Sequence, residues 1–326
     1  LLIACENPNN VTTPDAKTPS EAEKEPENER IYKSANIGTL KYINPGKFQY
    51  DKTTTNIAEI TKPYRIGEKE ITRAQFKAIM GADPSTLNYN TNMDDYPVEH
   101  VSFYAAIIFC NKLSIKEGLT PVYSIEGFDF GAYEYEEKDA VDLKTYWEKT
   151  LNKQELICDW EANGYRLPTN MEWTWAAMGA RVDAANPDAI DTTSWNKWYA
   201  GDDLSDMYMI NIPNFAVVNT LSKPSNMAKV GSIFSNEADL YDMSGNAFEW
   251  VWDKAGTLTG NITDWKGSPS SGVTSPRLIR GGDFSSPQNL VGLATSFVES
   301  PPWTAFTEDT RLTLKAKWVG FRVARN

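Results

Sequence analysis

The chain has 326 residues, a formal net charge of −12 and a pI near 4.8. Its hydrophobic fraction of 41% is enough for one large domain or two small ones. The acidic balance argues against nucleic acid as a partner, because nucleic-acid binding needs a basic face that neutralises phosphates. The longest uncharged apolar helical stretch, residues 103–109, is far short of the roughly 20 residues that a membrane span needs.

The counts of histidine and cysteine restrict the chemistry further. The only histidine is His100, and the cysteines are Cys5, Cys110 and Cys158. A single histidine excludes every metal or catalytic site that needs two or more histidines. The cysteines show no CxxC spacing, so no zinc or redox motif is indicated. His100, on the approach to a helix, fits a structural position better than a functional one.

Residues 1–5 match the end of a bacterial lipoprotein signal peptide, because an apolar run closes with Ala4 before Cys5. The charged start and most of the apolar region are missing, so the sequence is expected to begin inside that signal. Cys5 then becomes the first mature residue and carries the lipid that anchors the chain to a membrane. The alternative is a buried apolar start with an unmodified cysteine.

Residues 6–40 are expected to form a disordered tether. Residues 6–30 are rich in Asn, Pro, Thr, Glu and Lys, and such a segment cannot bury enough surface to offset its ordering entropy. When fully extended, these residues would reach about 80 Å. A lipid anchor, a tether and a domain at residues 41–326 together indicate a protein of the bacterial cell envelope. A binding role would place it on the surface of the outer membrane.

Three helix starts can be recognised in the domain. Thr72 with Gln75 and Thr169 with Glu172 form capping boxes, and Ser102 caps a helix between them. Each start is followed by apolar residues at helical spacing. The expected buried stripes contain Phe76, Ile79 and Met80; Ala105, Ile108, Phe109 and Leu113; and Trp173, Ala176 and Ala177. Strands are expected within residues 47–60 and 64–71, and short strands and loops, rather than βαβ units, elsewhere.

Several sequence blocks resemble those of one known family, and they occur in the family's order. They are YRIGEKEITRAQF at 64–76, YPVEHVSF at 96–103, FCNKLS at 109–114, GYRLPT at 164–169, LYDMSGNAFEWV at 240–251, RGG at 280–282 and GFR at 320–322. Together they resemble the formylglycine-generating-enzyme (sulfatase-modifying factor) family. The resemblance implies a C-type-lectin-type fold of the α+β class, with two main helices, small antiparallel sheets and long irregular loops. Residues 127–156 separate blocks that the family usually joins closely, so they are expected to form a surface insertion.

The resemblance also bears on catalysis. The family's oxidase uses two cysteines just after the Arg-Gly-Gly block, and their thiolates bind copper. Ser286 and Val291 stand at the corresponding positions here. Neither a hydroxyl nor an isopropyl group can replace a thiolate as a ligand of copper(I). A second enzyme branch builds an iron site from three histidines, which this chain lacks. The resemblance therefore implies a protein that has neither activity and requires no cofactor.

One structural metal site is implied by the same resemblance. Asp242, Gly245, Ala247 and Glu249 correspond to a calcium site of the enzyme relatives, in which two side-chain oxygens and two backbone carbonyls surround the ion. Oxygen ligands next to a tight glycine turn suit calcium. The alternative is a metal-free turn in which Glu249 accepts backbone hydrogen bonds.

The C-terminal segment, residues 277–326, is expected to bind a ligand. Between the Arg-Gly-Gly and Gly-Phe-Arg blocks it places large aromatic residues among polar ones on loops, which is typical of interfaces. The expected contacts are Asp283, Phe284, Ser286, Gln288, Asn289, Phe297, Glu299, Trp303, Phe306 and Trp318. The alternative is that these aromatic residues fill the core. Lectin-fold proteins diversified by retroelements end in such a segment, so the resemblance implies loop positions that vary.

These observations predict a surface receptor or adhesin without catalysis, whose partner is a macromolecule. Aromatic, fairly flat loops suit a protein partner better than a small sugar. Two alternatives stay open: a structural envelope module without a diversified ligand, and an enzyme of the same family with unrecognised chemistry. An apolar, self-packed C-terminal segment would favour the first alternative, and a bound transition metal would favour the second.

Overall fold

The computed structural model describes residues 31–135, 155–183, 185–202, 212–219, 226–256, 258–267, 276–288, 291–293 and 318–326, and the backbone of 297–299. The helices are α1 (Arg73–Met80), α2 (Phe103–Lys116), α4 (Asn170–Ala177) and α5 (Ile212–Phe215), with a 3-10 turn, η2, at Ser194–Asn196. The strands are β1 (Ile31–Ser34), β2 (Gly38–Ile43), β3 (Gly46–Gln49), β4 (Ile57–Ile60), β5 (Tyr64–Gly67), β6 (Tyr123–Ser124), β7 (Ile157–Cys158), β8 (Ile190–Asp191), β9 (Phe248–Lys254), β10 (Ile262–Thr263), β11 (Arg277–Arg280), β12 (Phe297–Glu299), β13 (Val319–Gly320) and β14 (Ala324–Arg325). Short strands and few helices confirm the expected α+β class.

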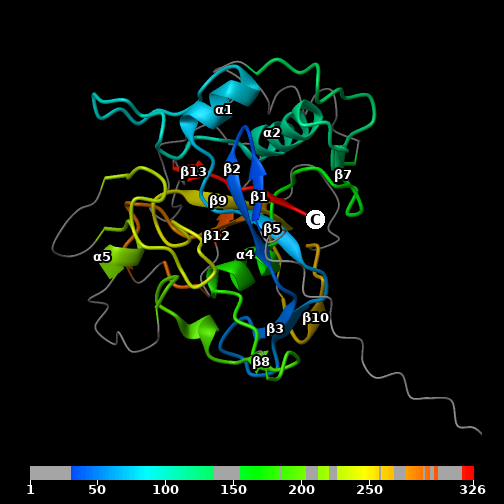
Figure 1. The fold of residues 1–326 in the computed structure, drawn as a ribbon, viewed down its shortest axis with the longest axis vertical. Helices are drawn as coiled ribbons and strands as arrows, with labels where there is room; N and C mark the ends of the chain where they lie inside the picture. The colour runs from blue at the N-terminus through cyan, green and yellow to red at the C-terminus, as the bar shows by residue number, and fades with distance from the viewer. Residues whose placement is uncertain are drawn as a thin grey trace, which may run out of the picture.

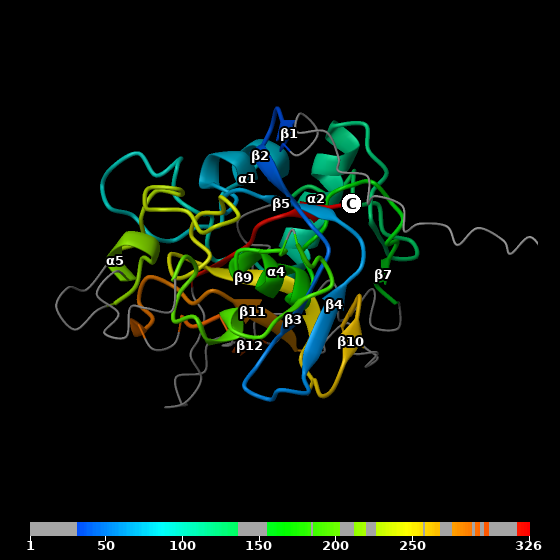
Figure 2. The same ribbon diagram turned by 60° about the horizontal axis from the view of Figure 1, so that its bottom comes forward.

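The described strands form three four-stranded sheets and one pair. Their orders are β1-β2-β5-β14, β10-β4-β3-β8, β12-β11-β9-β13 and β6-β7. In Figure 1, α1 and α2 lie at the top, the β3–β8–β10 sheet at the bottom, and α4 and β9 between them. Figure 2 shows α4 beside β9 and β11, which it contacts. The first sheet is antiparallel throughout and has β1 and β14 as its edge strands.

The three predicted helix starts are confirmed. Thr72 and Thr169 each accept a hydrogen bond from the backbone three residues later, and Gln75 and Glu172 complete the two capping boxes. Ser102 caps α2 in the same way, through Ala105 N. Every residue from the start of α2 to Asn111 is buried, so this helix lies inside the core rather than along its edge.

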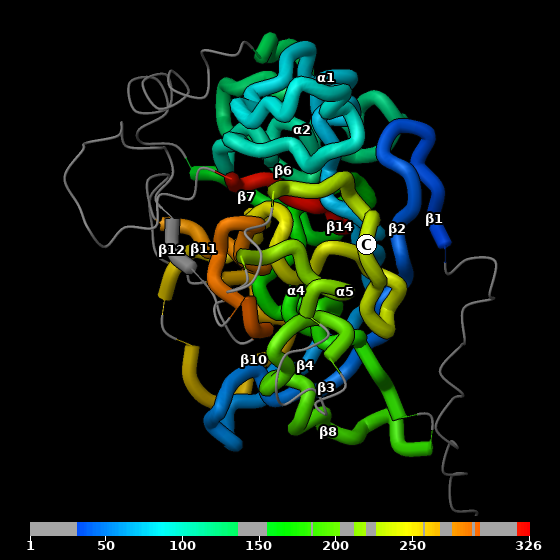
Figure 3. Tube along the Cα trace, turned by 90° about the vertical axis from the view of Figure 1, so that its left-hand side faces the viewer, coloured from blue at the N-terminus to red at the C-terminus, as the bar shows by residue number. Residues whose placement is uncertain are grey.

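The C-terminal residues run through the centre of the molecule. Phe321 meets Phe109 of α2 edge-on, with ring centroids 5.2 Å apart, and Phe76 of α1 at 6.3 Å. Val319 O accepts a hydrogen bond from Val101 N, and Arg166 exchanges two backbone hydrogen bonds with Ala324. Figure 3 shows this segment between the two helices and the strands below them. The last residues of the chain therefore hold the helical and sheet halves together.

The structure corrects two predicted boundaries. The folded domain includes residues 31–40, which were assigned to the tether, because β1 pairs with β2 and Ser34 Oγ donates a 2.5 Å hydrogen bond to Glu117 at the α2 C-terminus. The predicted insertion starts inside the core, since Phe130 and Tyr135 are buried against it. Residues 1–30 and 136–154, with Cys5 and most of the insertion, lie outside the described residues. No helix in the described part is long and apolar enough to cross a membrane.

Candidate ligand-binding face

The predicted binding segment begins with a tight turn after β11. Gly281 and Gly282 have φ angles of +88° and +78°, in the left-handed region that favours glycine. A Cβ atom on Gly282 would lie 2.6 Å from Val291 Cγ1, closer than packed atoms can approach. Gly281 O accepts a hydrogen bond from Gly245 N at 2.8 Å, which ties the turn to the block before β9. The Arg-Gly-Gly block thus fixes where the following residues point.

Two of the predicted ligand contacts are buried and build this turn. Asp283 is 5% exposed and Ser286 is 4% exposed. Asp283 Oδ1 accepts hydrogen bonds at 2.9 Å from Ser285 N, Ser285 Oγ and Ser286 Oγ, and burial raises the pKa of Asp283. Their assignment as ligand contacts is therefore corrected to a structural role, because the short side chains satisfy the turn's own polar groups.

Two of the predicted aromatic contacts lie together and stay partly open to solvent. Phe284 follows the glycine turn, and Trp318 directly precedes β13. Their ring centroids are 5.6 Å apart with planes at 47°, although 34 positions separate them in the chain. Phe284 N donates to Asn246 O at 3.0 Å, and Trp318 O accepts from Phe248 N at 2.9 Å. Both aromatic residues are thus fixed to the residues around the start of β9.

The other predicted contacts are located only in part. Gln288 is half-buried, next to Pro287, which forms a bridge with Asn219. Phe297 and Glu299 are in β12, opposite Ile279 and Arg277 of β11, and only their backbone is described. Asn289, Trp303 and Phe306 lie outside the described residues.

Comparison with known proteins places this arrangement in a family. The profile of the FGE-sulfatase family, described as the sulfatase-modifying factor enzyme 1-like domain, matches residues 27–326. The chain belongs to this family. Among curated proteins, chaperone protein LppX of Paenibacillus barcinonensis is 31% identical over 264 residues, covering 78% of this chain and 81% of LppX.

Solved structures confirm the fold. Treponema denticola variable protein 1 matches with a TM-score of 0.67 and 26% identity, over 90% of this chain and 98% of the other. CarF matches with a TM-score of 0.58 and 21% identity, over 87% and 96%. PvdO from Pseudomonas aeruginosa matches with a TM-score of 0.55 and 17% identity, over 91% and 97%. The last two, at such low identity, show the fold alone.

The positions that correspond to the oxidase cysteines carry no thiol in this member of the sulfatase-modifying factor family. Ser286 Oγ donates to Asp283 Oδ1, and Val291 packs with Tyr199 and Ile212 in a small apolar cluster. The two described cysteines lie elsewhere and are free thiols. Burial raises the pKa of Cys158 to about 12 and also raises that of Cys110, so both stay protonated at neutral pH and are poor nucleophiles.

The residues of the expected calcium site lie together, but Glu249 is already paired with a cation. Its Oε1 accepts from Arg322 NH2 and its Oε2 from Arg322 Nε, both at 2.7 Å. Trp173 Nε1 also donates to Oε2, at 2.8 Å. Asp242 Oδ2 accepts from Gly231 N, whereas Oδ1 is buried without a hydrogen-bond partner among the described residues. A carboxylate neutralised by arginine fits calcium poorly, so this geometry supports the metal-free alternative. The hydrogen-bond donors to Glu249 are the side chains of Arg322 and Trp173 rather than backbone amides.

A third carboxylate that the sequence did not single out joins this cluster. Glu70 is buried and accepts hydrogen bonds from Asn246 Nδ2 at 2.7 Å and Ala247 N at 3.0 Å. Burial, followed by the charges of Asp242 and Glu249, raises the pKa of Glu70 well above its usual range. Glu70 was missed because it follows β5 as an ordinary charged residue, and only the fold brings it to the β9 turn.

Proposed function

We propose that this protein is a lipid-anchored surface receptor or adhesin that binds a macromolecular ligand, best a protein, and performs no catalysis. The Phe284–Trp318 pair carries this proposal. The two rings come from segments far apart in the chain, contact each other at a tilt and keep part of their surface open. Aromatic residues on a rigid support are typical anchors of protein interfaces, because they bury large areas with little loss of conformational freedom.

The turn that carries Phe284 is rigid. Such a turn suits a binding face whose exposed side chains differ between variants of the protein while the fold stays the same. Gly281, Gly282, Asp283 and Ser286 are buried and define the turn, whereas Phe284 and Gln288 on the same turn are partly open. We propose that a retroelement diversifies the open positions. Comparing the coding DNA with a nearby template repeat tests this idea, and substitutions that do not coincide with template adenines would contradict it.

The absence of catalysis rests on the chemistry of the described residues. Ser286 and Val291 cannot supply the thiolates that bind copper, and the two described cysteines have raised pKa values. The name of the relative LppX, a chaperone, is consistent with a binding role. A bound transition metal, or substrate turnover that is lost on changing a single polar residue, would contradict this part of the proposal.

Attachment to the bacterial envelope is proposed through lipid on Cys5, on the outer surface of the outer membrane. The support is the apolar run before Cys5 and the polar composition of residues 6–30. Metabolic labelling with a radioactive fatty acid should label the wild type and not Cys5→Ser. Protease added to intact cells should remove the domain if it faces outward, and full protection would contradict the outer surface.

The binding test uses the full chain, immobilised through its N-terminal end, and a panel of purified extracellular and bacterial surface proteins. A protein retained by the wild type should be lost from the double variant Phe284→Ala/Trp318→Ala, because both anchors are removed. The control is Ile190→Ala, which removes an exposed apolar side chain in β8, at the bottom of Figure 1. If the double variant retains ligand as well as the control does, the face is not the binding site.

A further inference from the structure

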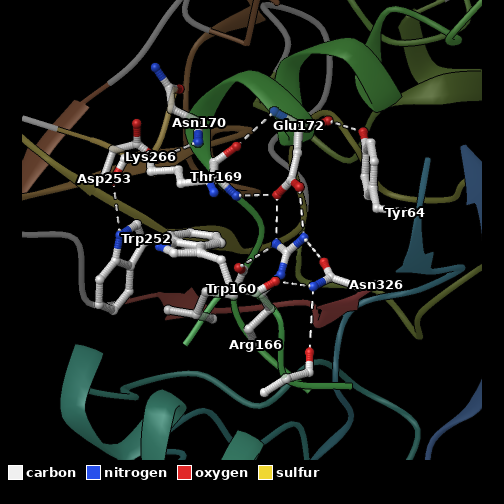
Figure 4. Close-up of polar contacts among 12 residues, drawn as sticks. Tyr64, Trp160, Arg166, Thr169, Asn170, Glu172, Trp252, Asp253, Lys266 and Asn326 are labelled. Atoms are coloured by element: carbon white, nitrogen blue, oxygen red, sulfur yellow. Dashed lines mark hydrogen bonds and ion pairs between the residues drawn. The ribbon is translucent and has the colours of Figure 1, made fainter. Parts of the chain in front are cut away.

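A separate pocket of about 220 Å³ lies beside the last residue of the chain. Its walls come from four segments: the β4–β5 connection, residues 160–172, residues 264–266 and Asn326. Figure 4 shows the polar contacts around it. None of the residues of the Phe284–Trp318 face lines this pocket, so it is independent of the proposed receptor function.

An ion pair held by several hydrogen bonds lines the pocket. Arg166 NH1 and NH2 donate to the two carboxylate oxygens of Glu172, both at 2.7 Å, and NH2 also donates to Asn326 Oδ1 at 2.9 Å. The Asn326 amide in turn donates to Trp160 O at 2.5 Å. Tyr64 Oη donates to Glu172 O at 2.5 Å from the β5 side. These contacts hold the polar groups in place before any ligand arrives.

Two indole rings supply apolar surface to the same pocket. Trp160 and Trp265 both line it, and both are only half-buried. The Lys266 ammonium lies 4.9 Å from the centroid of the Trp160 ring, where cation–π attraction holds it. Lys266 is exposed and lines the pocket, so a ligand in the pocket can reach its ammonium donors.

The charged side chains that line the pocket are equal in number for the two signs. Three cations, Lys62, Arg166 and Lys266, face three carboxylates, Glu161, Glu172 and Asp264. An anionic ligand would meet the carboxylates and a cationic ligand would meet the ammonium and guanidinium groups. A neutral ligand rich in hydroxyl groups suits such a lining, because each hydroxyl both donates and accepts hydrogen bonds.

The volume of the pocket limits the size of the ligand. Pockets for drug-sized molecules measure about 300–1,000 Å³, so this one holds a single small unit or one unit of a longer chain. A pyranose ring has one apolar face that can lie on an indole and a rim of hydroxyl groups. We propose that the pocket lined by Trp160, Trp265 and Lys266 binds one neutral pyranose unit of a glycan.

The test is saturation-transfer NMR of the full-length protein with glucose, galactose, mannose, N-acetylglucosamine and glucuronate. N-acetylglucosamine stands for bacterial wall glycans, and galactose and mannose for surface glycans of other cells. Binding of a single ring is expected at about millimolar concentrations. At least one neutral sugar should receive saturation, and its identity indicates whether the glycan belongs to a bacterial wall or to the surface of another cell. Glucuronate should bind more weakly.

Three variants tie the signal to the pocket. Trp265→Ala should abolish it, and Lys266→Met, which keeps the alkyl chain over Trp160, should weaken binding about 5-fold. Trp198→Ala removes a 42% exposed indole that does not line the pocket and should bind as the wild type does. The proposal is overturned if no neutral sugar binds, if glucuronate binds best, or if Lys266→Met binds unchanged. If Trp265→Ala fails to fold, the sugar affinity of Lys266→Met alone tests the proposal.

Discussion

Two arginine–glutamate pairs in this protein have the same chemistry and very different surroundings. In both, the guanidinium makes two hydrogen bonds of 2.7 Å to the carboxylate. The side chains of Arg322 and Glu249 are 0% exposed, whereas those of Arg166 and Glu172 are 3% and 13% exposed. Glu249 of the first pair follows Phe248, whose backbone N donates to Trp318 O, and the second pair lines the proposed glycan pocket.

The neighbours of each pair explain what it does. Arg322 also donates to Gly67 O at 3.0 Å and Tyr241 O at 2.8 Å, so it joins the end of β5 to the turn before β9. Glu70 and Asp242 are two further carboxyl groups that interact electrostatically with Arg322. Arg166, by contrast, lines a pocket that solvent can enter. A fully buried pair stabilises the scaffold, and a partly open one can also present polar groups to a ligand.

The largest expected effect follows from replacing Arg322 with leucine. The change leaves Glu249 buried beside Glu70 and Asp242 without a compensating cation, so the free energy of unfolding should fall by about 4 kcal/mol. Urea unfolding followed by circular dichroism measures this loss. Lys62→Met, which breaks an exposed pair with Glu161, serves as the control and should change stability by less than about 0.5 kcal/mol. A loss as small as the control's would show that Arg322 is not essential to the scaffold.

Replacing Arg166 with leucine should have the next largest effect, about 2–3 kcal/mol. Glu172 keeps some contact with water and with its capping partner Thr169, so its charge is less costly without the arginine. The same urea experiment compares the two variants directly. A greater loss for Arg166→Leu than for Arg322→Leu would reverse the distinction between the two pairs.

A buried acid next to the second pair should make stability depend on pH. Burial, and then the charge of Glu172, raises the pKa of Asp253 to about 7. The folded protein therefore binds this proton more tightly than the unfolded chain does, and its stability falls as pH rises from about 4 to 7. In Asp253→Asn this loss disappears. The stability of the variant relative to the wild type should therefore rise between pH 4 and pH 8, with most of the change below pH 7. Parallel pH curves for the two proteins would contradict the prediction.

The smallest effect is expected from calcium. Because Arg322 neutralises Glu249, adding calcium or removing it with EDTA should move the melting temperature by less than about 1 °C. Differential scanning calorimetry at neutral pH measures this shift. A calcium-dependent rise of several degrees that is absent in Asp242→Asn would restore the calcium site implied by the family resemblance.

Sequence alone predicted the features that depend on neighbouring residues. The caps at Thr72, Ser102 and Thr169 were predicted because a helix start is encoded within four residues. Residues 31–40 were assigned to the tether instead of the domain, because the burial of Ser34 depends on Glu117 of a distant helix. No local pattern reveals such a contact.

The candidate site was predictable to a similar extent. Phe284 and Trp318 were both expected as ligand contacts, because large aromatic residues among polar ones on loops are typical of interfaces, but only the fold shows that their rings meet. The burial of Asp283 and Ser286 could not be predicted, since polar residues after a glycine pair fit an exposed loop equally well. Trp160, Trp265 and Lys266 were missed because they belong to no motif and meet only around the pocket.

The position of the last residues has a consequence for synthesis. β13 and β14 are edge strands of two sheets, and Arg322 lies between them in the chain, so the core is complete only after residues 319–325 have left the ribosome. A chain that ends early or changes reading frame before Val319 lacks both strands and the guanidinium that neutralises Glu249. Such a product should be unstable and open to proteolysis. β13, Arg322 and β14 thus act as a check on translation, so that folded molecules are those translated in frame through the candidate binding segment.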